Sequence, residues 1–227
     1  MSSHNLGEIE EIVDLVDLLG VRFFQFIIVN HLGRAARRDM FAQGHSRLYE
    51  ILLDLAHRRP SFRDALRDST LGNLIACSVA GLYFHHCGLG FQKNYYVQAD
   101  GDVFPCRATI RPEFKIGNVR DPSFESFDQF QHQLLQSFRA AGVDDLNQTC
   151  ATCEHRYSCA GDCRGETYQT TGSFSVPHPS CADLRASFYT VLWAAIDDPN
   201  LYFDKTEAFY RRTGIRDAIS QVLSTPT

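Results

Sequence analysis

The chain has 227 residues and a formal net charge of −5 at pH 7, with 44% hydrophobic and 22% charged residues. Its length is ample for a packed core, and its composition is that of an ordinary globular protein. The negative balance argues against nucleic acid or an acidic membrane surface as a partner, and no apolar run approaches the ~20 residues needed to cross a bilayer. Residues 1–7 are polar, so no signal peptide is expected and the chain is predicted to be cytoplasmic.

The first 80 residues alternate predicted helices and strands. An apolar stripe predicts a helix over Glu8–Leu19, followed by a buried strand at Val21–Val29. A second helix is expected over Arg47–Arg58 and a second buried strand at Asn73–Val79. This order favours α/β units with parallel strands. Because two strands cannot close a barrel, residues 1–80 are either the tail of a larger barrel, which we favour, or a module that docks on another chain.

The pattern changes after His86, where turns and cysteines become frequent. Strands are expected at Asn94–Gln98 and Val103–Phe104, joined by a hairpin turn in which Gly101 supplies a positive φ. The remaining expected elements are a helix over Phe124–Ala140, a polar loop over Gly142–Thr149, a helix over Cys181–Asp197 and an amphipathic helix over Lys205–Leu223.

Seven cysteines form one spaced pattern. Cys87 and Cys106 flank the predicted hairpin, the run that begins at Cys150 has the spacing C-x2-C-x5-C-x3-C, and Cys181 follows. Thiolates are soft ligands that suit iron–sulfur clusters or zinc, and each such site takes about four of them. With Cys77 the chain has eight cysteines, enough in number for two sites. Without an export signal the thiols should stay reduced, which favours metal binding over a disulfide framework.

This arrangement resembles the SPASM domain, an extension at the C-terminus of many radical S-adenosylmethionine enzymes that holds two auxiliary iron–sulfur clusters. The matching stretches are Cys87–Gly90, Asp100–Cys106, Ile116–Val119 and Cys159–Cys163. The preceding segment resembles the closing units of the radical enzyme barrel, including a Gly-Arg-Ala turn at residues 33–35. The expected fold is therefore α/β. It has the last units of a partial (β/α) barrel at residues 1–80, a cysteine-rich α+β SPASM iron–sulfur domain at 81–200, and a C-terminal helix and tail at 201–227.

The short spacing of the cysteine run groups Cys150, Cys153 and Cys159 at one centre, whereas the full ligand sets come from the resemblance. It implies a first auxiliary 4Fe-4S cluster bound by Cys87, Cys106 and Cys163, and a second bound by Cys150, Cys153, Cys159 and Cys181. Cys77 is either a further ligand of the first cluster or a small buried hydrophobic residue, and its place in an apparent strand favours the second role. His155 and Arg156 are candidate hydrogen-bond donors that would raise a cluster's potential.

The sequence contains no C-x3-C-x2-C loop, the motif that in these enzymes holds the cluster that cleaves S-adenosylmethionine. S-adenosylmethionine is therefore expected only where a missing N-terminal part is supplied, and whether the chain is itself an enzyme stays open. The leading hypothesis is the auxiliary iron–sulfur part of an enzyme that modifies a ribosomal peptide or protein, in electron transfer and substrate binding. The alternatives are a non-catalytic iron–sulfur partner of a separate radical enzyme subunit, and a zinc-stapled interaction module.

Overall fold

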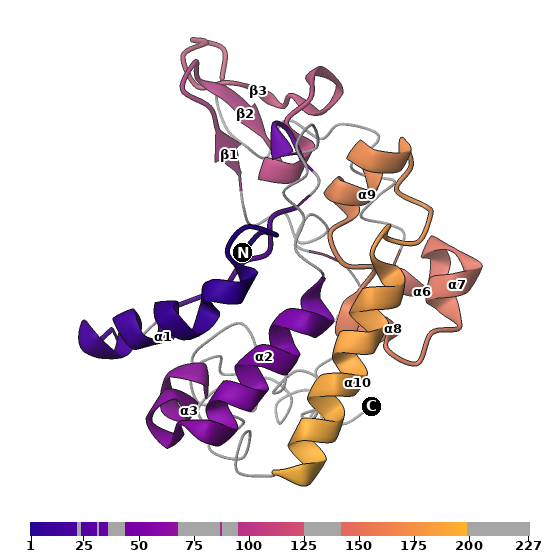
Figure 1. Cartoon of the computed structure of the whole chain (residues 1–227). Helices are drawn as coiled ribbons and strands as arrows, with labels where there is room; N and C mark the ends of the chain where they lie inside the picture. Colours follow the sequence, from indigo (N-terminus) through magenta and orange to yellow (C-terminus); the bar gives the residue numbers. More distant parts are fainter. Residues whose placement is uncertain are drawn as a thin grey trace, which may run out of the picture. The chain divides into compact units, whose positions relative to one another are not determined.

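The computed structural model describes residues 1–21, 24–30, 32–35, 44–67, 87, 95–124 and 142–198 (Figure 1). Contacts divide the chain into two compact units. Unit 1 comprises Met1–Val29, Met40–Leu82 and Ala182–Thr227, and unit 2 comprises Asn30–Asp39 and Tyr83–Cys181. The domain boundaries at residues 80 and 200 that we expect from the sequence remain a prediction.

Unit 1 is built from helices around one hydrophobic core. Its elements are the 3-10 turn η1 (Leu6–Glu8), α1 (Ile9–Leu18), α2 (His45–Arg58), α3 (Pro60–Arg67) and α10 (Cys181–Asp197), whose first residue belongs to unit 2. The helices predicted over Glu8–Leu19, Arg47–Arg58 and Cys181–Asp197 are confirmed. Their apolar stripes meet because burial removes nonpolar surface from water. The core contains Val13 of α1, Leu52 and Leu55 of α2, Phe62 of α3 and Val191 of α10.

The sequence also predicted a buried strand at Val21–Val29, and here the structure corrects the prediction. The described residues 24–29 form no strand. A strand requires a ladder of hydrogen bonds to a neighbour, and the backbone bond recorded for Val29 is one from its N–H to the Met1 carbonyl at 2.9 Å. The second expected strand, Asn73–Val79, lies outside the described residues. The barrel units therefore remain a proposal.

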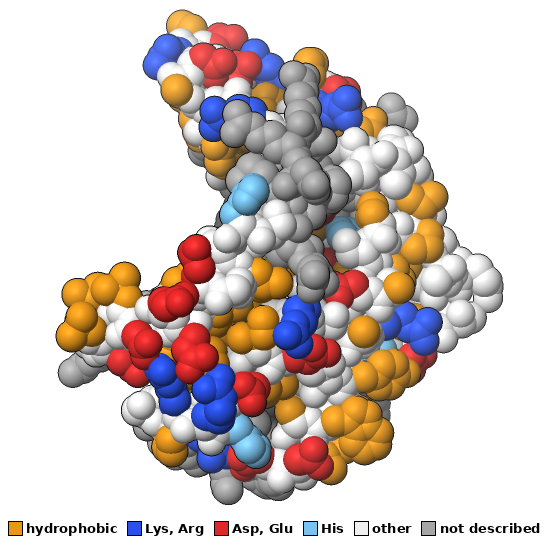
Figure 2. Space-filling view, in the orientation of Figure 1, with side chains coloured by type: hydrophobic (Ala, Val, Ile, Leu, Met, Phe, Trp, Pro, Cys, Tyr) orange, Lys and Arg blue, Asp and Glu red, His pale blue; other side chains and the backbone are white. Residues whose placement is uncertain are grey.

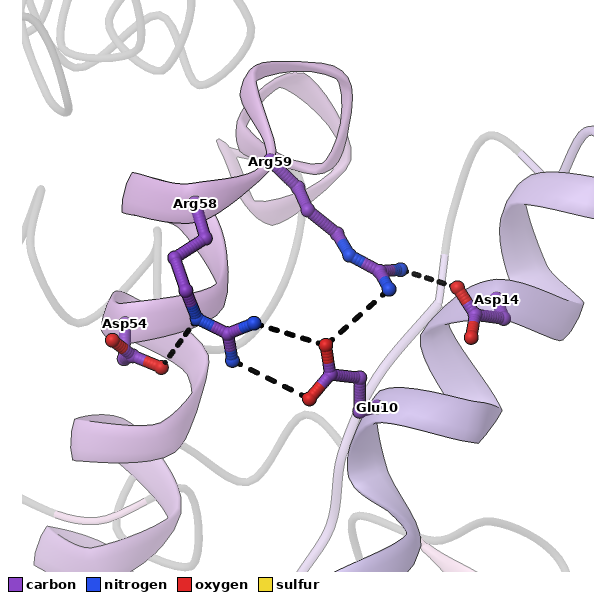
Figure 3. A network of polar contacts seen from close by, with 5 residues as sticks. All are labelled: Glu10, Asp14, Asp54, Arg58 and Arg59. Atoms are coloured by element: carbon purple, nitrogen blue, oxygen red, sulfur yellow. Dashed lines mark hydrogen bonds and ion pairs between the residues drawn. The ribbon is translucent and has the colours of Figure 1, made fainter.

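A network of opposite charges joins α1 to the junction of α2 and α3 (Figure 3). Arg58 donates to Glu10 at 3.0 Å and to Asp54 at 2.9 Å, while Arg59 donates to Asp14 and to Glu10. The hydrogen bonds that Arg58 donates to Glu10 and Asp54 raise its pKa. Because these side chains are solvated, the network orients the helices and adds little to their stability.

Asp183, in the first turn of α10, holds the N-terminus of α2. Its carboxylate accepts hydrogen bonds from the backbone N–H of His45 at 2.6 Å and of Ser46 at 3.3 Å, and from the Ser46 hydroxyl. The first N–H groups of a helix have no partner within the helix, and a negative charge there also complements the helix dipole. Asp183 therefore acts as an N-cap of α2, although it lies far from α2 in the sequence.

We expect Asp183→Ala to lower the free energy of unfolding by about 1–2 kcal/mol, since it leaves the N-terminus of α2 without this acceptor. Asp17→Ala, at an exposed position of α1, is the matched control and should change that free energy by less than about 0.5 kcal/mol. Denaturant unfolding followed by circular dichroism measures both variants. Equal midpoints for the two would show that the cap contributes nothing.

The described part of unit 2 begins with a three-stranded antiparallel sheet. Its strands are β1 (Tyr96–Val97), β2 (Asp102–Phe104) and β3 (Gly117–Asn118), in the order β1-β2-β3. Tyr96 pairs with Phe104 and Asp102 pairs with Asn118. The predicted hairpin is confirmed, with Gly101 at φ +92° in its turn. The third strand was not predicted, because two residues are too few to show a period of two.

Short helical turns make up the rest of unit 2. They are η4 (Arg107–Thr109), η5 (Pro112–Phe114), α6 (Val143–Leu146), α7 (Gln148–Ala151), α8 (Arg156–Cys159) and α9 (Arg164–Thr171). They correct the polar loop expected over Gly142–Thr149, which contains α6 and the start of α7. Val143 and Leu146 are both buried, so a single helical turn forms to bury one apolar pair, and that pair is too short a signal for a periodicity argument.

Unit 2 also has its own small hydrophobic core. It consists of Phe104, Phe114 and Phe174, which we call the aromatic core, and Tyr168 stacks on Phe174 with ring centroids 4.5 Å apart. The predicted helices over Phe124–Ala140 and Lys205–Leu223 lie outside the described residues, apart from Phe124. Among the helices that are described, none is both long and apolar enough to span a membrane.

Candidate metal centre

The seven cysteines of the pattern all belong to unit 2. None of the seven forms a disulfide, and each is partly buried. They are Cys87, Cys106, Cys150, Cys153, Cys159, Cys163 and Cys181, whereas Cys77 lies outside the described residues. Reduced, partly buried thiols can become metal ligands once they lose their protons.

Cys106 and Cys163 come together because α9 begins against the η4 turn. Cys106 caps η4, and its Sγ accepts the Ala108 N–H at 3.4 Å. Gly165, in the first turn of α9, approaches so closely that a Cβ on it would lie 2.7 Å from the Ala108 Cβ and 3.0 Å from the Ala108 carbonyl oxygen. Gln169 donates to that same oxygen at 2.7 Å. The absence of a side chain at Gly165 therefore lets the two cysteine-bearing turns meet.

The first predicted ligand set is gathered around this contact. Cys87 and Cys106 both pack against the aromatic core. The pKa of Cys163 is raised to about 12, chiefly by burial; the charges of Asp162, Glu166 and Cys106 contribute to the rise, while the Glu166 N–H, which bonds to the sulfur, opposes it. Cys106 and Cys163 are thus within electrostatic range of each other, although the assignment of all three as ligands stays a prediction.

The second predicted ligand set also interacts through charge. Cys150 and Cys153 share one turn, in which the Cys153 N–H donates to the Cys150 carbonyl at 3.1 Å. Burial raises the pKa of Cys150, and the charges of Cys181 and Cys153 add to that shift. The pKa of Cys159 is raised to about 12, chiefly by burial and in smaller part by the charges of Asp162, Cys150 and Cys181. Once these thiols lose their protons, their negative charges would repel one another, and a bound metal would compensate that charge.

The loop between Cys159 and Cys163 has a strained backbone. Ala160, Gly161 and Asp162 have φ angles of +52°, +77° and +52°. A left-handed conformation costs a non-glycine residue roughly 1–2 kcal/mol, and turns of this kind direct backbone N–H groups towards anions and iron–sulfur sites. The Gly161 N–H donates to the Cys159 sulfur and thereby opposes the rise in its pKa. The conformation thus supplies a donor to a candidate ligand.

Arg164 brings a positive charge into the same region. Its side chain is 2% exposed. Burial lowers its pKa, and the charges of Cys87 and Cys150, one from each predicted ligand set, partly oppose that shift. We did not single out Arg164 from the sequence, because an arginine at the start of a helix is usually solvated. Arg156, which we predicted as a donor to a cluster, donates to Asp144 at 3.2 Å and to the carbonyl of Cys153, a candidate ligand, at 3.1 Å, so its donation to a cluster remains a prediction.

The described residues contain no group of three or more His, Cys, Asp or Glu side chains that converges tightly enough to hold a single metal ion. In kind, the donors present fit iron–sulfur clusters. They combine thiols, which can become the thiolate ligands, with N–H groups directed at sulfur and a buried guanidinium, and the last two stabilise the negative charge of thiolate-bound iron. The sequence pattern identified the thiols but could not identify the groups around them.

The sequence comparisons agree with this chemistry. Residues 87–154 match the SPASM model, described as an iron–sulfur cluster-binding domain. That match includes Cys87, Cys106, Cys150 and Cys153 and ends before the other three cysteines. The PqqA peptide cyclase of Rhizobium meliloti is 25% identical over 78% of this chain and 46% of its own length. The mycofactocin maturase MftC of Mycobacterium ulcerans is 26% identical over 80% of this chain and 48% of its own length.

A solved structure, "Native anSMEcpe with bound AdoMet", superposes with a TM-score of 0.59 at 17% identity, covering 88% of this chain and 55% of that one. At that identity the likeness concerns the fold. The chain spans about half the length of the curated relatives it matches.

Proposed function

We propose a function from the premise that this chain carries a SPASM domain and resembles the C-terminal part of a radical S-adenosylmethionine enzyme. It would be the auxiliary iron–sulfur part of an enzyme that modifies a ribosomal peptide or protein, in electron transfer and substrate binding. The observation that carries this proposal is that the seven pattern cysteines, none of them in a disulfide, are partly buried within one compact unit. There the charges of Cys181 and Cys153 act on Cys150, those of Cys150 and Cys181 act on Cys159, and that of Cys106 acts on Cys163.

Two ligand sets would hold two 4Fe-4S clusters. Cys87, Cys106 and Cys163 would bind the first, with Cys77 as the candidate fourth ligand, and Cys150, Cys153, Cys159 and Cys181 would bind the second. Thiolate-bound clusters supply one-electron transfer at potentials from about −700 to +450 mV, set by charge and hydrogen bonds. In this chain Arg164 would supply positive charge near the clusters, and the N–H groups that donate to the cysteine sulfurs would supply the hydrogen bonds.

The substrate would be a peptide or protein. Two relatives support this, since one is named for cyclising the PqqA peptide and the other for mycofactocin maturation. S-adenosylmethionine would take part only with an N-terminal segment that carries the C-x3-C-x2-C loop absent from this sequence. We place the protein in the cytoplasm, where thiols stay reduced.

A second candidate is a non-catalytic iron–sulfur partner of a separate radical enzyme subunit, which would itself carry the C-x3-C-x2-C loop that these 227 residues lack. The encoding DNA distinguishes the two candidates. An in-frame C-x3-C-x2-C upstream would make this chain part of one longer enzyme, and a stop codon in its place would favour the partner.

We expect the chain purified without oxygen to be brown and to contain about eight iron and eight sulfide per chain, because each 4Fe-4S cluster contributes four of each. Chemical assays of iron, acid-labile sulfide and zinc, together with the visible spectrum, measure this. Zinc in place of iron, with no sulfide, would contradict the proposal and leave a zinc-stapled interaction module.

A further inference from the structure

Asn147 holds Cys150 by two hydrogen bonds. Its Oδ1 accepts the backbone N–H of Cys150 at 2.9 Å, which caps α7, and its Nδ2 donates to the Cys150 Sγ at 3.4 Å. The orientation of the amide follows from this pairing. A backbone N–H can only donate, so the amide oxygen must face it, and that places the NH2 group at the sulfur.

We propose that Asn147 is a positioning residue that fixes Cys150 and raises the reduction potential of the cluster that Cys150 would ligate. The inference rests on the proposed function. Reduction adds negative charge to the cluster and its thiolate sulfurs, and an N–H dipole with its positive end at sulfur stabilises that charge. Removing the donor should therefore make the cluster harder to reduce, which means a lower potential.

The hydrogen-bond donor at Cys150 differs in kind from the donors at the other candidate ligands. Cys106 receives the backbone N–H of Ala108 at 3.4 Å, and Cys159 and Cys163 receive those of Gly161 and Glu166. Backbone donors remain when a side chain is replaced. The donor at Cys150 belongs to a side chain, so a single substitution can remove it while the chain keeps its course.

Asn147→Ser and Asn147→Asp separate the two roles of the residue. Serine and aspartate cap helices about as well as asparagine, so both keep an acceptor for the Cys150 N–H. Serine lacks the second donor, and aspartate places a negative oxygen where the NH2 group was. We expect the potential of the second cluster to fall in the order Asn, Ser, Asp, whereas a purely structural role would leave all three alike.

The measurement is a redox titration of the full chain with its clusters, followed by electron paramagnetic resonance. The same titration in a Cys106→Ser background, which removes the first cluster, assigns each signal. Gln148→Ala, at the exposed neighbouring position, is the matched control and should leave both potentials unchanged. A chelator should remove iron from the second cluster of Asn147→Ser roughly tenfold faster, in line with other groups that support metal ligands.

The first cluster serves as an internal reference, since among the described residues the side-chain amide of Asn147 hydrogen-bonds to Cys150 and to none of the predicted ligands of that cluster. An unchanged potential and unchanged iron retention in Asn147→Ser would overturn the inference, and so would an equal shift of both clusters. If Asn147→Ser bound no iron, the potential measured in Asn147→Asp would test the inference, because aspartate also caps α7, through a carboxylate in place of a hydroxyl. If the unsubstituted chain bound no iron, the proposed function itself would be overturned. That result differs from one in which both clusters form and their potentials do not depend on residue 147.

Discussion

Replacing either Cys159 or Cys163 by serine should lower the iron content of the chain from about eight atoms to about four, because a hydroxyl is a poor substitute for a soft thiolate ligand. The two residues lie at the ends of one strained loop, so the variants are closely matched in position. They should nevertheless remove different clusters. Cys159 interacts with Cys150 and Cys181, whereas Cys163 interacts with Cys106.

Double variants test whether Cys159 and Cys163 ligate different clusters. Combining Cys163→Ser with Cys106→Ser should cost no more iron than either change alone, since both ligands belong to one predicted cluster. Combining Cys163→Ser with Cys159→Ser should remove nearly all iron. The opposite pattern, in which the loop pair costs four irons and the Cys163–Cys106 pair costs eight, would show that the loop serves a single cluster and that the crossed ligand sets are wrong.

The sequence predicted the parts of this molecule that have long or specific signals. The helices α1, α2 and α10 follow from apolar stripes that run over several turns, and the hairpin follows from Gly101 between two short apolar runs. Cysteine spacing identified the thiols, since few other structures need that pattern. Each of these signals is local, and each can be read without knowing which segments meet.

The parts that were missed depend on distant contacts or on very short elements. Nothing near His45 indicates that Asp183 caps α2, because the two are far apart in the sequence. The turn α6 has one apolar pair, and Asn147 is simply one more polar residue in a polar segment. The strand expected after α1 shows the converse error, since its apolar residues enter the core of unit 1 while the described residues 24–29 form no ladder.

Replacing Gly165 by alanine should abolish the first cluster and destabilise unit 2, even though alanine is the better helix former by about 1 kcal/mol. The new Cβ would lie 2.7 Å from the Ala108 Cβ, closer than real Cβ contacts, and 3.0 Å from a backbone oxygen, tighter than most of them. Overpacking of this kind costs about 1–3 kcal/mol, and here the strain falls on the contact that holds the turns of Cys106 and Cys163 together. Iron content and thermal unfolding measure the two effects.

Gly7→Ala is the matched control, since a Cβ there meets nothing within 4 Å, and it should leave iron and stability unchanged. Ala108→Gly tests the cause directly. Placed in the Gly165→Ala chain, it removes the Cβ that the new methyl group meets and should restore part of the iron, with the carbonyl contact still limiting the recovery. A Gly165→Ala chain with eight irons would mean that α9 can move away from η4 without separating the two cysteines, so that the cysteine spacing alone, and not this close backbone approach, would define the first cluster.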